Sequence, residues 1–214
     1  MKTIALCDFE TNPQNHQLVR QTLEEGQLVC IPTPSGYKLI ADLGSPAAIT
    51  AMLQAKRRVK NAPALIFVPG GEWVEKVAQV VSDEARLLMG QFWPGPVTLL
   101  FKASDDIHPK VRKPLTKAKG WLGVRVPEDD VAAEVIRLFG RPVLVSSANL
   151  AKKKGAHSVA QVKKNFGRTV ALMVDAGDLP QSPSSTLVDV SKGTVSVVRA
   201  GAVEAERIMG VLAG

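Results

Sequence analysis

Arg141-Pro142-Val143-Leu144-Val145-Ser146-Ser147-Ala148-Asn149 is the stretch from which the fold of this chain is best predicted. The apolar run after Pro142 predicts a short buried strand. Ser147 and Asn149 stand two residues apart, so in an extended segment their side chains point to the same face. A hydroxyl and an amide both donate and accept hydrogen bonds, which suits a polar ligand at a strand end. The same stretch is also typical of a strand that runs into an Asn-containing turn.

Helical and strand patterns alternate on both sides of this stretch, which favours an α/β fold around a largely central sheet. Further strands are expected at residues 28–31, 64–68, 97–101, 121–126, 170–174, 186–190 and 194–199, with the last two forming a hairpin. Helices are expected at 16–25, 45–58 and 131–139, after Ser82 and Ser158, and at the C-terminal end. No repeat and no long linker divides the sequence, so it predicts a single domain over residues 1–214.

Three serines mark expected helix starts. Ser45 precedes Pro46, which is a favoured pair at a helix N-terminus. Ser82 precedes acidic residues that suit the first turn of a helix. Ser158 and Gln161 form the capping-box pattern, in which the serine side chain caps the helix. Residues 107–120 are polar and basic, and we expect a surface connection with one helical turn there.

Composition places the chain among ordinary globular proteins. Hydrophobic residues make up 45% of its 214 residues and charged residues 22%, so it can bury a core without disulfide bonds. The formal net charge of +7 favours a polyanionic partner or an anionic small substrate. Cys7 and Cys30 have no metal-ligand spacing and fit a reducing compartment.

No membrane or export segment is predicted. The apolar run after Met1 ends at Asp8 and Glu10, too soon for a signal peptide. No stretch approaches the roughly 20 apolar residues of a membrane helix. We therefore expect a cytoplasmic location.

Several common reaction types are disfavoured by the motifs that are missing. The sequence contains no Walker A pattern, no GxGxxG, no HExxH, no CxxC and no GxSxG. His16, His108 and His157 are scattered among polar residues and are expected as solvated surface side chains, and no metal site is predicted. An enzyme with this inventory would bind and orient charged reactants, and its fixed cations would stabilise the transition state.

Six short motifs occur in a fixed order along the chain. They are Lys56-x-Arg58, FWPGPVTL at 92–99, Val124-Arg125-Val126-Pro127, Ser147-Ala148-Asn149, Ser185-Thr186-Leu187-Val188-Asp189 and Arg199-Ala200-Gly201. Taken singly, each has a structural explanation, such as cations at a helix C-terminus or a rigid turn. Together, their order resembles the YrdC family of L-threonylcarbamoyladenylate synthases over about residues 15–203.

The resemblance implies both a fold and a reaction. The expected fold is a twisted mixed β-sheet with flanking helices and a large basic central cavity. The implied reaction condenses L-threonine, bicarbonate and ATP into threonylcarbamoyl-adenylate and pyrophosphate, with Mg²⁺ shared among the phosphates. The product would pass to threonylcarbamoyl-transferase machinery that forms N6-threonylcarbamoyladenosine at position 37 of tRNA.

The resemblance also assigns roles to residues of this sequence. It implies that four residues act in catalysis: Lys56, Arg58, Ser147 and Asn149. Nucleotide binding falls to Lys56, Arg58, Asn149 and Arg199. Threonine binding falls to Thr33, Arg125, Ser147 and Ser185.

Some positions depart from the family pattern. Where most synthases read PTETVYGL, residues 32–39 read PTPSGYKL, so Pro34 replaces the glutamate and Lys38 the glycine. The other departures are Ala62 for Asn or Lys, Phe67 for histidine, and Trp121 for a small hydroxyl residue. The PTxSGY spelling is closer to the YciO branch of the same fold.

An alternative function is RNA binding with weak or no synthase activity. Basic clusters at residues 110–119 and 152–164 would contact the phosphates of tRNA or double-stranded RNA. The same clusters are also compatible with a solvated face that maintains solubility.

Overall fold

The computed structural model describes residues 1–56, 64–116, 120–150 and 156–213. The chain divides into two units, and each is assembled from two separate segments. The first unit comprises Met1–Val59 and Asp129–Ser182, and the second comprises Lys60–Glu128 and Pro183–Gly214.

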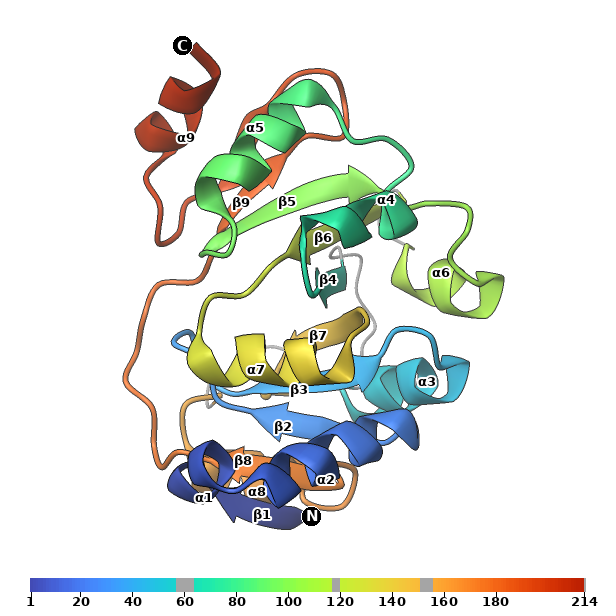
Figure 1. The fold of residues 1–214 in the computed structure, drawn as a ribbon, viewed down its shortest axis with the longest axis vertical. Helices are drawn as coiled ribbons and strands as arrows, with labels where there is room; N and C mark the ends of the chain where they lie inside the picture. The colour runs from blue at the N-terminus through green and yellow to red at the C-terminus, as the bar shows by residue number, and fades with distance from the viewer. Residues whose placement is uncertain (57–63, 117–119, 151–155, 214) are drawn as a thin grey trace. The chain divides into compact units, whose positions relative to one another are not determined.

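The first unit contains a mixed sheet. Its strand order is β1 (Lys2–Ala5), β8 (Leu172–Asp175), β2 (Val29–Ile31), β3 (Lys38–Asp42) and β7 (Val143–Ser147). β8 runs parallel to β1 and β2, whereas β3 is antiparallel to both β2 and β7. The helices are α1 (Leu6–Thr11), α2 (Pro13–Glu24), α3 (Pro46–Ala55), α7 (Asp130–Phe139) and α8 (Val159–Phe166). α2 packs against β2, β3 and α7, and α3 against β3 (Figure 1).

Apolar side chains from the helices and strands of the first unit exclude water from its interior. Leu23 of α2, Ile31 of β2, Ile40 of β3 and Phe166 of α8 are all inaccessible to solvent. Burial of side chains of this size contributes roughly 1.5–3 kcal/mol each. This core holds β3 and β7 in place, and those strands carry several of the predicted site residues.

The second unit also contains a mixed sheet. Its strand order is β4 (Ala64–Phe67), β6 (Trp121–Arg125), β5 (Val97–Lys102), β9 (Thr186–Asp189) and β10 (Ser196–Arg199). β4 is parallel to β6 and β5 to β9, and the other two pairings are antiparallel. The helical segments are η1 (Gly71–Trp73), α4 (Val74–Val77), α5 (Asp83–Phe92), α6 (Pro109–Leu115) and α9 (Ala205–Ala213). α5 packs against α9 (Figure 1).

The predicted α/β class, with a mixed sheet and flanking helices, is confirmed. The predicted hairpin is also confirmed, because β9 and β10 pair in antiparallel fashion. The single domain over residues 1–214 and the large basic cavity stay predictions. In the part of the chain that the structure covers, no helix has the length and apolarity needed to cross a bilayer.

β3 is the main strand that the sequence did not predict. All five of its residues are buried, including the charged Lys38 and Asp42, and charges are rare at such positions. Asp42 pairs with Arg141 at 3.0 Å and accepts a hydrogen bond from the Gly44 N–H at 2.8 Å. These partners offset the cost of burying the carboxylate. An ion pair with Arg141, which is distant in sequence, therefore stabilises a strand whose charged residues make it hard to predict from the local sequence.

Two of the three predicted serine caps are confirmed. The Ser45 hydroxyl accepts from the Ala48 N–H at 3.2 Å, and the Ser82 hydroxyl accepts from the Ala85 N–H at 3.3 Å. α2 begins at Pro13, earlier than expected, because the Asn12 side chain accepts from the Gln14 N–H at 2.9 Å.

The predicted capping box at Ser158 is wrong. α8 does begin at Val159, but the Ser158 side chain makes no capping hydrogen bond. The Val159 N–H instead donates to the Asp178 carboxylate at 2.8 Å. A carboxylate at a helix N-terminus also interacts favourably with the helix dipole, so the turn after β8 supplies a better cap than the local serine.

Two shorter segments also differ from expectation. Residues 107–120 contain α6, longer than the single turn expected, and His108 Nδ1 accepts from the Lys110 N–H at its start. The N-terminal residues form β1, which pairs with β8, followed by α1. Neither element shows the periodicity that identifies longer helices and strands.

The assignment of Asp178, and not Ser158, as the cap of α8 is testable by mutation. We expect Asp178→Ala to lower the free energy of unfolding by about 1 kcal/mol, because α8 loses its side-chain cap. Ser158→Ala is the matched control and should change stability by less than about 0.5 kcal/mol. Urea unfolding midpoints at constant m-value measure both changes. A larger loss for Ser158→Ala than for Asp178→Ala would contradict the assignment.

Candidate functional site

Lys56 lies at the C-terminal end of α3 and points at the end of β7. Its ammonium donates to the carbonyl oxygens of Ser147 and Asn149 and lies 3.4 Å from Asn149 Oδ1. The side chain is 9% exposed, and its nitrogen lies 5.8 Å from the centre of the Phe166 ring. The structure therefore brings together three residues that the resemblance assigned to catalysis.

The chain turns immediately after β7. Ser147 is the last residue of the strand, and the Asn149 N–H donates back to the Ser147 carbonyl at 2.8 Å. The expectation that Ser147 and Asn149 share one face of an extended segment is wrong, because Asn149 lies beyond the strand. The alternative of a strand followed by an Asn-containing turn is confirmed. The turn nevertheless contributes to the candidate site, because it directs the carbonyl groups of Ser147 and Asn149 toward Lys56.

Lys38 is a cation in this region to which the sequence assigned no role. It begins β3, stands opposite Ser147 of β7 in the antiparallel register, and is 8% exposed. Its ammonium donates to Ser147 Oγ and to the Ser35 carbonyl, both at 3.2 Å. The sequence feature that could have identified Lys38 as a site residue is that it stands where the family pattern has glycine.

Thr33 lies in a tight loop that leads into β3. Its hydroxyl donates to the Gly36 carbonyl at 2.7 Å, and the Gly36 N–H donates to the Thr33 carbonyl at 2.9 Å. Gly36 has φ +97°, and a Cβ there would lie 3.0 Å from the Ala156 carbonyl oxygen, so the loop requires glycine. Thr33 is 6% exposed, and its hydroxyl keeps acceptor capacity for a ligand.

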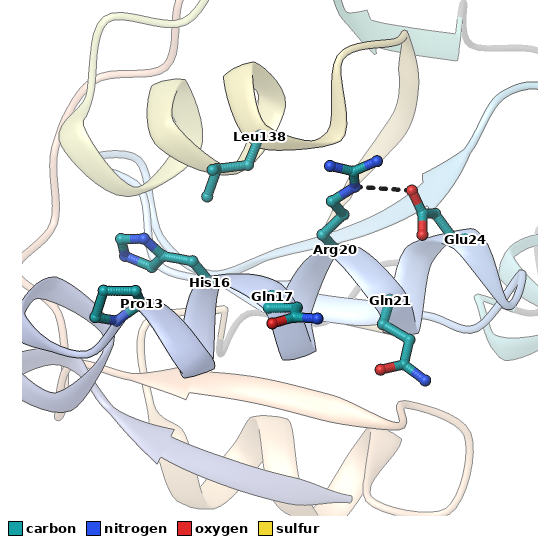
Figure 2. Close-up of a pocket in the computed structure, with 7 residues that line it drawn as sticks. All are labelled: Pro13, His16, Gln17, Arg20, Gln21, Glu24 and Leu138. Carbon is teal, nitrogen blue, oxygen red and sulfur yellow. Dashed lines mark hydrogen bonds and ion pairs between the residues drawn. The ribbon is translucent and has the colours of Figure 1, made fainter.

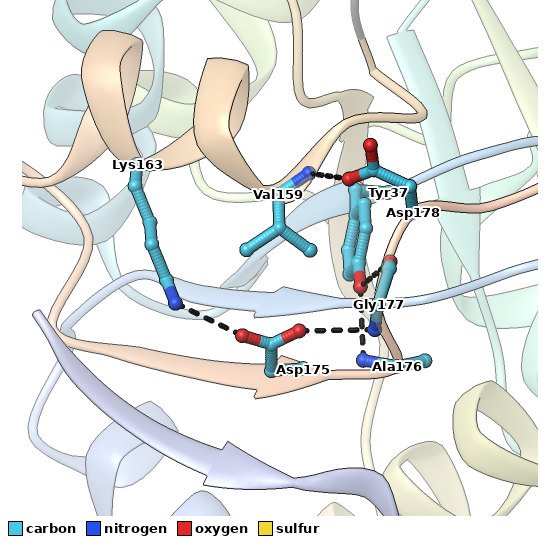
Figure 3. A network of polar contacts seen from close by, with 7 residues as sticks. All are labelled: Tyr37, Val159, Lys163, Asp175, Ala176, Gly177 and Asp178. Atoms are coloured by element: carbon cyan, nitrogen blue, oxygen red, sulfur yellow. Dashed lines mark hydrogen bonds and ion pairs between the residues drawn. The ribbon is translucent and has the colours of Figure 1, made fainter.

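Tyr37 ties this loop to the turn after β8 (Figure 3). Its hydroxyl donates to the Gly177 carbonyl at 2.7 Å and accepts from the Ala176 N–H at 2.9 Å. Burial raises the pKa of the Tyr37 hydroxyl to about 12, with a further contribution from the nearby Asp175 carboxylate. The phenol therefore stays protonated and acts as a fixed structural link.

Asp175 completes the network in Figure 3. Its carboxylate accepts from Lys163 Nζ at 2.9 Å and from the Gly177 N–H at 3.0 Å. Burial opposes ionisation, but these two donors outweigh it and lower the pKa of the Asp175 carboxyl. The ionised aspartate therefore holds the turn against which Tyr37 is anchored.

Arg125 ends β6 in the second unit and is 8% exposed. Its Nε donates to the Gly95 carbonyl at 2.6 Å, and its guanidinium carbon lies 5.5 Å from the centre of the Phe67 ring. The Gly95 N–H donates to the Val126 carbonyl at 3.1 Å, so the FWPGP turn is attached to the end of β6. Phe67, which stands where the family pattern often has histidine, thus makes a cation–π contact with Arg125.

A second polar group in the same unit surrounds Ser185. The hydroxyl oxygens of Ser185 and Thr98 lie 2.8 Å apart, and Arg199 donates to the Ser185 carbonyl at 2.8 Å. Gly201 allows the close approach of this segment, since a Cβ there would lie 2.3 Å from the Ser184 carbonyl oxygen. Sequence reasoning assigned no role to Thr98, although its hydroxyl is part of the FWPGPVTL motif.

The predicted site residues therefore fall into two groups by unit. Thr33, Lys56, Ser147 and Asn149 belong to the first unit. Arg125, Ser185 and Arg199 belong to the second unit. Arg58 and Ala62 lie outside the described residues.

A pocket of about 560 Å³ lies along α2 and includes Leu138 of α7 (Figure 2). It contains His16 and the Arg20–Glu24 ion pair at 2.8 Å, but none of the predicted site residues. His16 packs against Phe9 with ring centroids 4.6 Å apart, and its side chain is 21% exposed. His16 is therefore half-buried against Phe9, whereas the sequence predicted a solvated surface side chain.

Comparison with known proteins identifies relatives over most of the chain. The family model for Sua5, YciO and YrdC proteins, described as telomere recombination, matches residues 21–201. A putative threonylcarbamoyl-AMP synthase of Mycobacterium tuberculosis is 35% identical over 190 residues, which cover 89% of this chain and 85% of the relative. The threonylcarbamoyl-AMP synthase of Pyrococcus abyssi is 30% identical over 89% of this chain but only 55% of its own length.

Solved structures agree with these matches. The structure of P. abyssi Sua5 complexed with L-threonine superposes with a TM-score of 0.85 at 27% identity, covering 99% of this chain and 60% of that one. The chain thus spans about three-fifths of Sua5. Escherichia coli YciO superposes with a TM-score of 0.77 at 23% identity, covering 97% of this chain and 98% of that one, which shows a shared fold.

The lowered pKa of Asp175 predicts a pH-dependent contribution to stability. A carboxyl whose folded pKa is depressed stabilises the fold above its unfolded pKa of about 3.9, and this contribution is lost as pH falls through the folded value. We expect Asp175→Asn to be about 1 kcal/mol less stable than the wild type at pH 7. The difference should narrow below about pH 4. Urea unfolding from pH 7 to pH 2.5 measures it, and a difference that stays constant over this range would contradict the prediction.

Proposed function

Because the chain belongs to the family of Sua5, YciO and YrdC proteins, we propose that it is an L-threonylcarbamoyladenylate synthase. It would use L-threonine, bicarbonate and ATP, and its product would serve threonylcarbamoyl-transferase machinery that modifies tRNA in the cytoplasm. Relatives at 35% and 30% identity that are named threonylcarbamoyl-AMP synthases support this proposal. The structural observation that carries it is the convergence of Lys56 on Ser147 and Asn149.

The proposed reaction has two chemical steps. The threonine amine reacts with bicarbonate to give a carbamate and water. A carbamate oxygen then attacks the α-phosphate of ATP and expels pyrophosphate. Transfers of this kind depend mainly on positioning and on neutralisation of phosphate charge. ATP would enter with Mg²⁺ carried on its phosphates.

Residues of the first unit suit this chemistry. Lys56 would neutralise phosphate charge, because its ammonium is already held in one orientation by two carbonyl groups. Arg58, which lies outside the described residues, would also act on the phosphates, and Asn149 would bind the nucleotide. Ser147 and Thr33 would hydrogen-bond threonine, with Thr33 acting as an acceptor because its proton already goes to Gly36.

Residues of the second unit are assigned to threonine and the nucleotide. Arg125 would pair with the threonine carboxylate, for which a guanidinium fork is well shaped. Its Nε donates to the Gly95 carbonyl, which helps to fix the orientation of the guanidinium. Ser185 would hydrogen-bond threonine, and Arg199 would bind the nucleotide.

The proposal is tested by pyrophosphate release in the presence of Mg²⁺. We expect release to require threonine, bicarbonate and ATP together, and Lys56→Met to lower kcat/KM by roughly 100-fold or more. Lys102→Met is the matched control, because Lys102 is an exposed strand lysine and should leave the rate unchanged. Pyrophosphate release that is independent of threonine and bicarbonate, under conditions in which a verified synthase shows that dependence, would overturn the proposed function.

RNA binding is a second candidate function. It is supported by the net charge of +7 and by α6, where Lys110 and Lys113 are exposed. Within the 110–119 cluster, Arg112 pairs with Asp105, so this cation is partly neutralised. Residues 117–119 and 152–155 of the two predicted clusters lie outside the described residues.

Salt dependence tests this second function. If lysines of α6 contact phosphates, the affinity for tRNA or double-stranded RNA should fall by roughly 0.7–0.9 log units per contact for each tenfold rise in salt. The double variant Lys110→Gln/Lys113→Gln should bind more weakly and reduce the salt slope by about one to two. Binding that is absent or insensitive to salt would remove RNA as a partner.

A further inference from the structure

Lys38 and Lys56 both donate hydrogen bonds to Ser147. Lys38 donates to the hydroxyl of Ser147 at 3.2 Å, and Lys56 donates to its carbonyl. The two lysines are 8% and 9% exposed, whereas Ser147 itself is half-buried. Two largely buried ammonium groups around one partly exposed serine create a local positive potential.

The hydrogen bond from Lys38 also sets the polarity of Ser147. A serine hydroxyl has one proton to donate and two lone pairs that accept. Lys38 occupies one lone pair, so the O–H points away from the Lys38 ammonium and can donate to a ligand. A ligand at Ser147 can therefore accept this hydrogen bond, and the adjacent ammonium groups favour a negatively charged acceptor.

The fold holds Lys38 in this position independently of any ligand. Antiparallel pairing places Lys38 directly opposite Ser147, where cross-strand side chains are in contact. The carbonyl of Ser35 supplies a second fixed acceptor at 3.2 Å. Tyr37, the neighbouring residue, is anchored by its hydroxyl to the turn at Ala176 and Gly177. Such preorganisation is required of a group that orients a small anion.

We propose that Lys38, together with the Ser147 hydroxyl, binds a carboxylate-type oxyanion and thereby determines specificity in the first unit. Two substrates of the proposed reaction have this chemistry: bicarbonate and the carboxylate of threonine. The inference rests on the proposed function for its choice of anions. It goes beyond the family pattern, in which a glycine stands at this position and offers no charge.

Steady-state kinetics test the inference with Lys38→Met, Lys38→Arg and the control Lys102→Met. We expect Lys38→Met to raise the KM for bicarbonate or for threonine about tenfold or more, while the KM for ATP stays within about twofold. Lys38→Arg keeps the charge and should retain most of the affinity, and Lys102→Met should match the wild type. The substrate whose KM rises identifies the anion.

A uniform loss of activity with all KM values unchanged would indicate a structural role and overturn the proposal. A rise confined to the KM for ATP would point to a triphosphate contact and overturn it as well. Urea midpoints for each variant verify that the protein is folded.

Direct binding separates this inference from the proposed function. ¹³C-labelled bicarbonate and L-threonine are titrated separately, without ATP, into the wild type and Lys38→Met at constant ionic strength and monitored by NMR. Binding of one anion by the wild type that is weakened about tenfold in Lys38→Met supports the anion site even if no pyrophosphate is released. Equal binding by the two proteins, or binding of neither anion, would overturn the site while leaving the synthase assay to decide the proposed function.

Discussion

The antiparallel pairing of β3 with β7 is the constraint on which the candidate site of the first unit depends. This register places Lys38 opposite Ser147 and leaves the end of β7 where Lys56 reaches it. A shift of the register by one residue would turn every side chain of β3 to the opposite face. The pairing is maintained by the buried apolar residues of β3, Leu39 and Ile40, and by the Asp42–Arg141 ion pair at its far end.

Charges at both ends of β3 are held by partners that are distant in sequence. Asp42 is stabilised by Arg141, next to the start of β7, and Lys38 by Ser147 at the end of the same strand. A buried charge without such partners would cost several kcal/mol. The same contacts that make β3 a stable strand therefore also fix the position of a cation beside Ser147, so stability and the candidate site share their interactions.

The second unit uses a different means of fixing its polar residues. Arg125 and Ser185 are held mainly by backbone carbonyls and by the Thr98 hydroxyl, at places where the chain approaches itself closely. Gly95 and Gly201 permit this approach, because a side chain at either position would collide with a carbonyl oxygen. The motifs FWPGPVTL and Arg199-Ala200-Gly201 thus combine polar groups with the glycines that bring them into contact.

The sequence alone determined the α/β class, most strands and helices, and the order of motifs that predicts the family. These features follow from local periodicity and short-range turn chemistry, which need no knowledge of distant residues. Only the tertiary structure revealed β3, the replacement of Ser158 by Asp178 as the cap of α8, and the contact of Lys56 with the carbonyl groups at the end of β7. Each of these depends on a partner far away along the chain, so no local pattern could specify it. The role proposed for Lys38 likewise depends on a distant residue, because the strand register places Ser147 opposite Lys38.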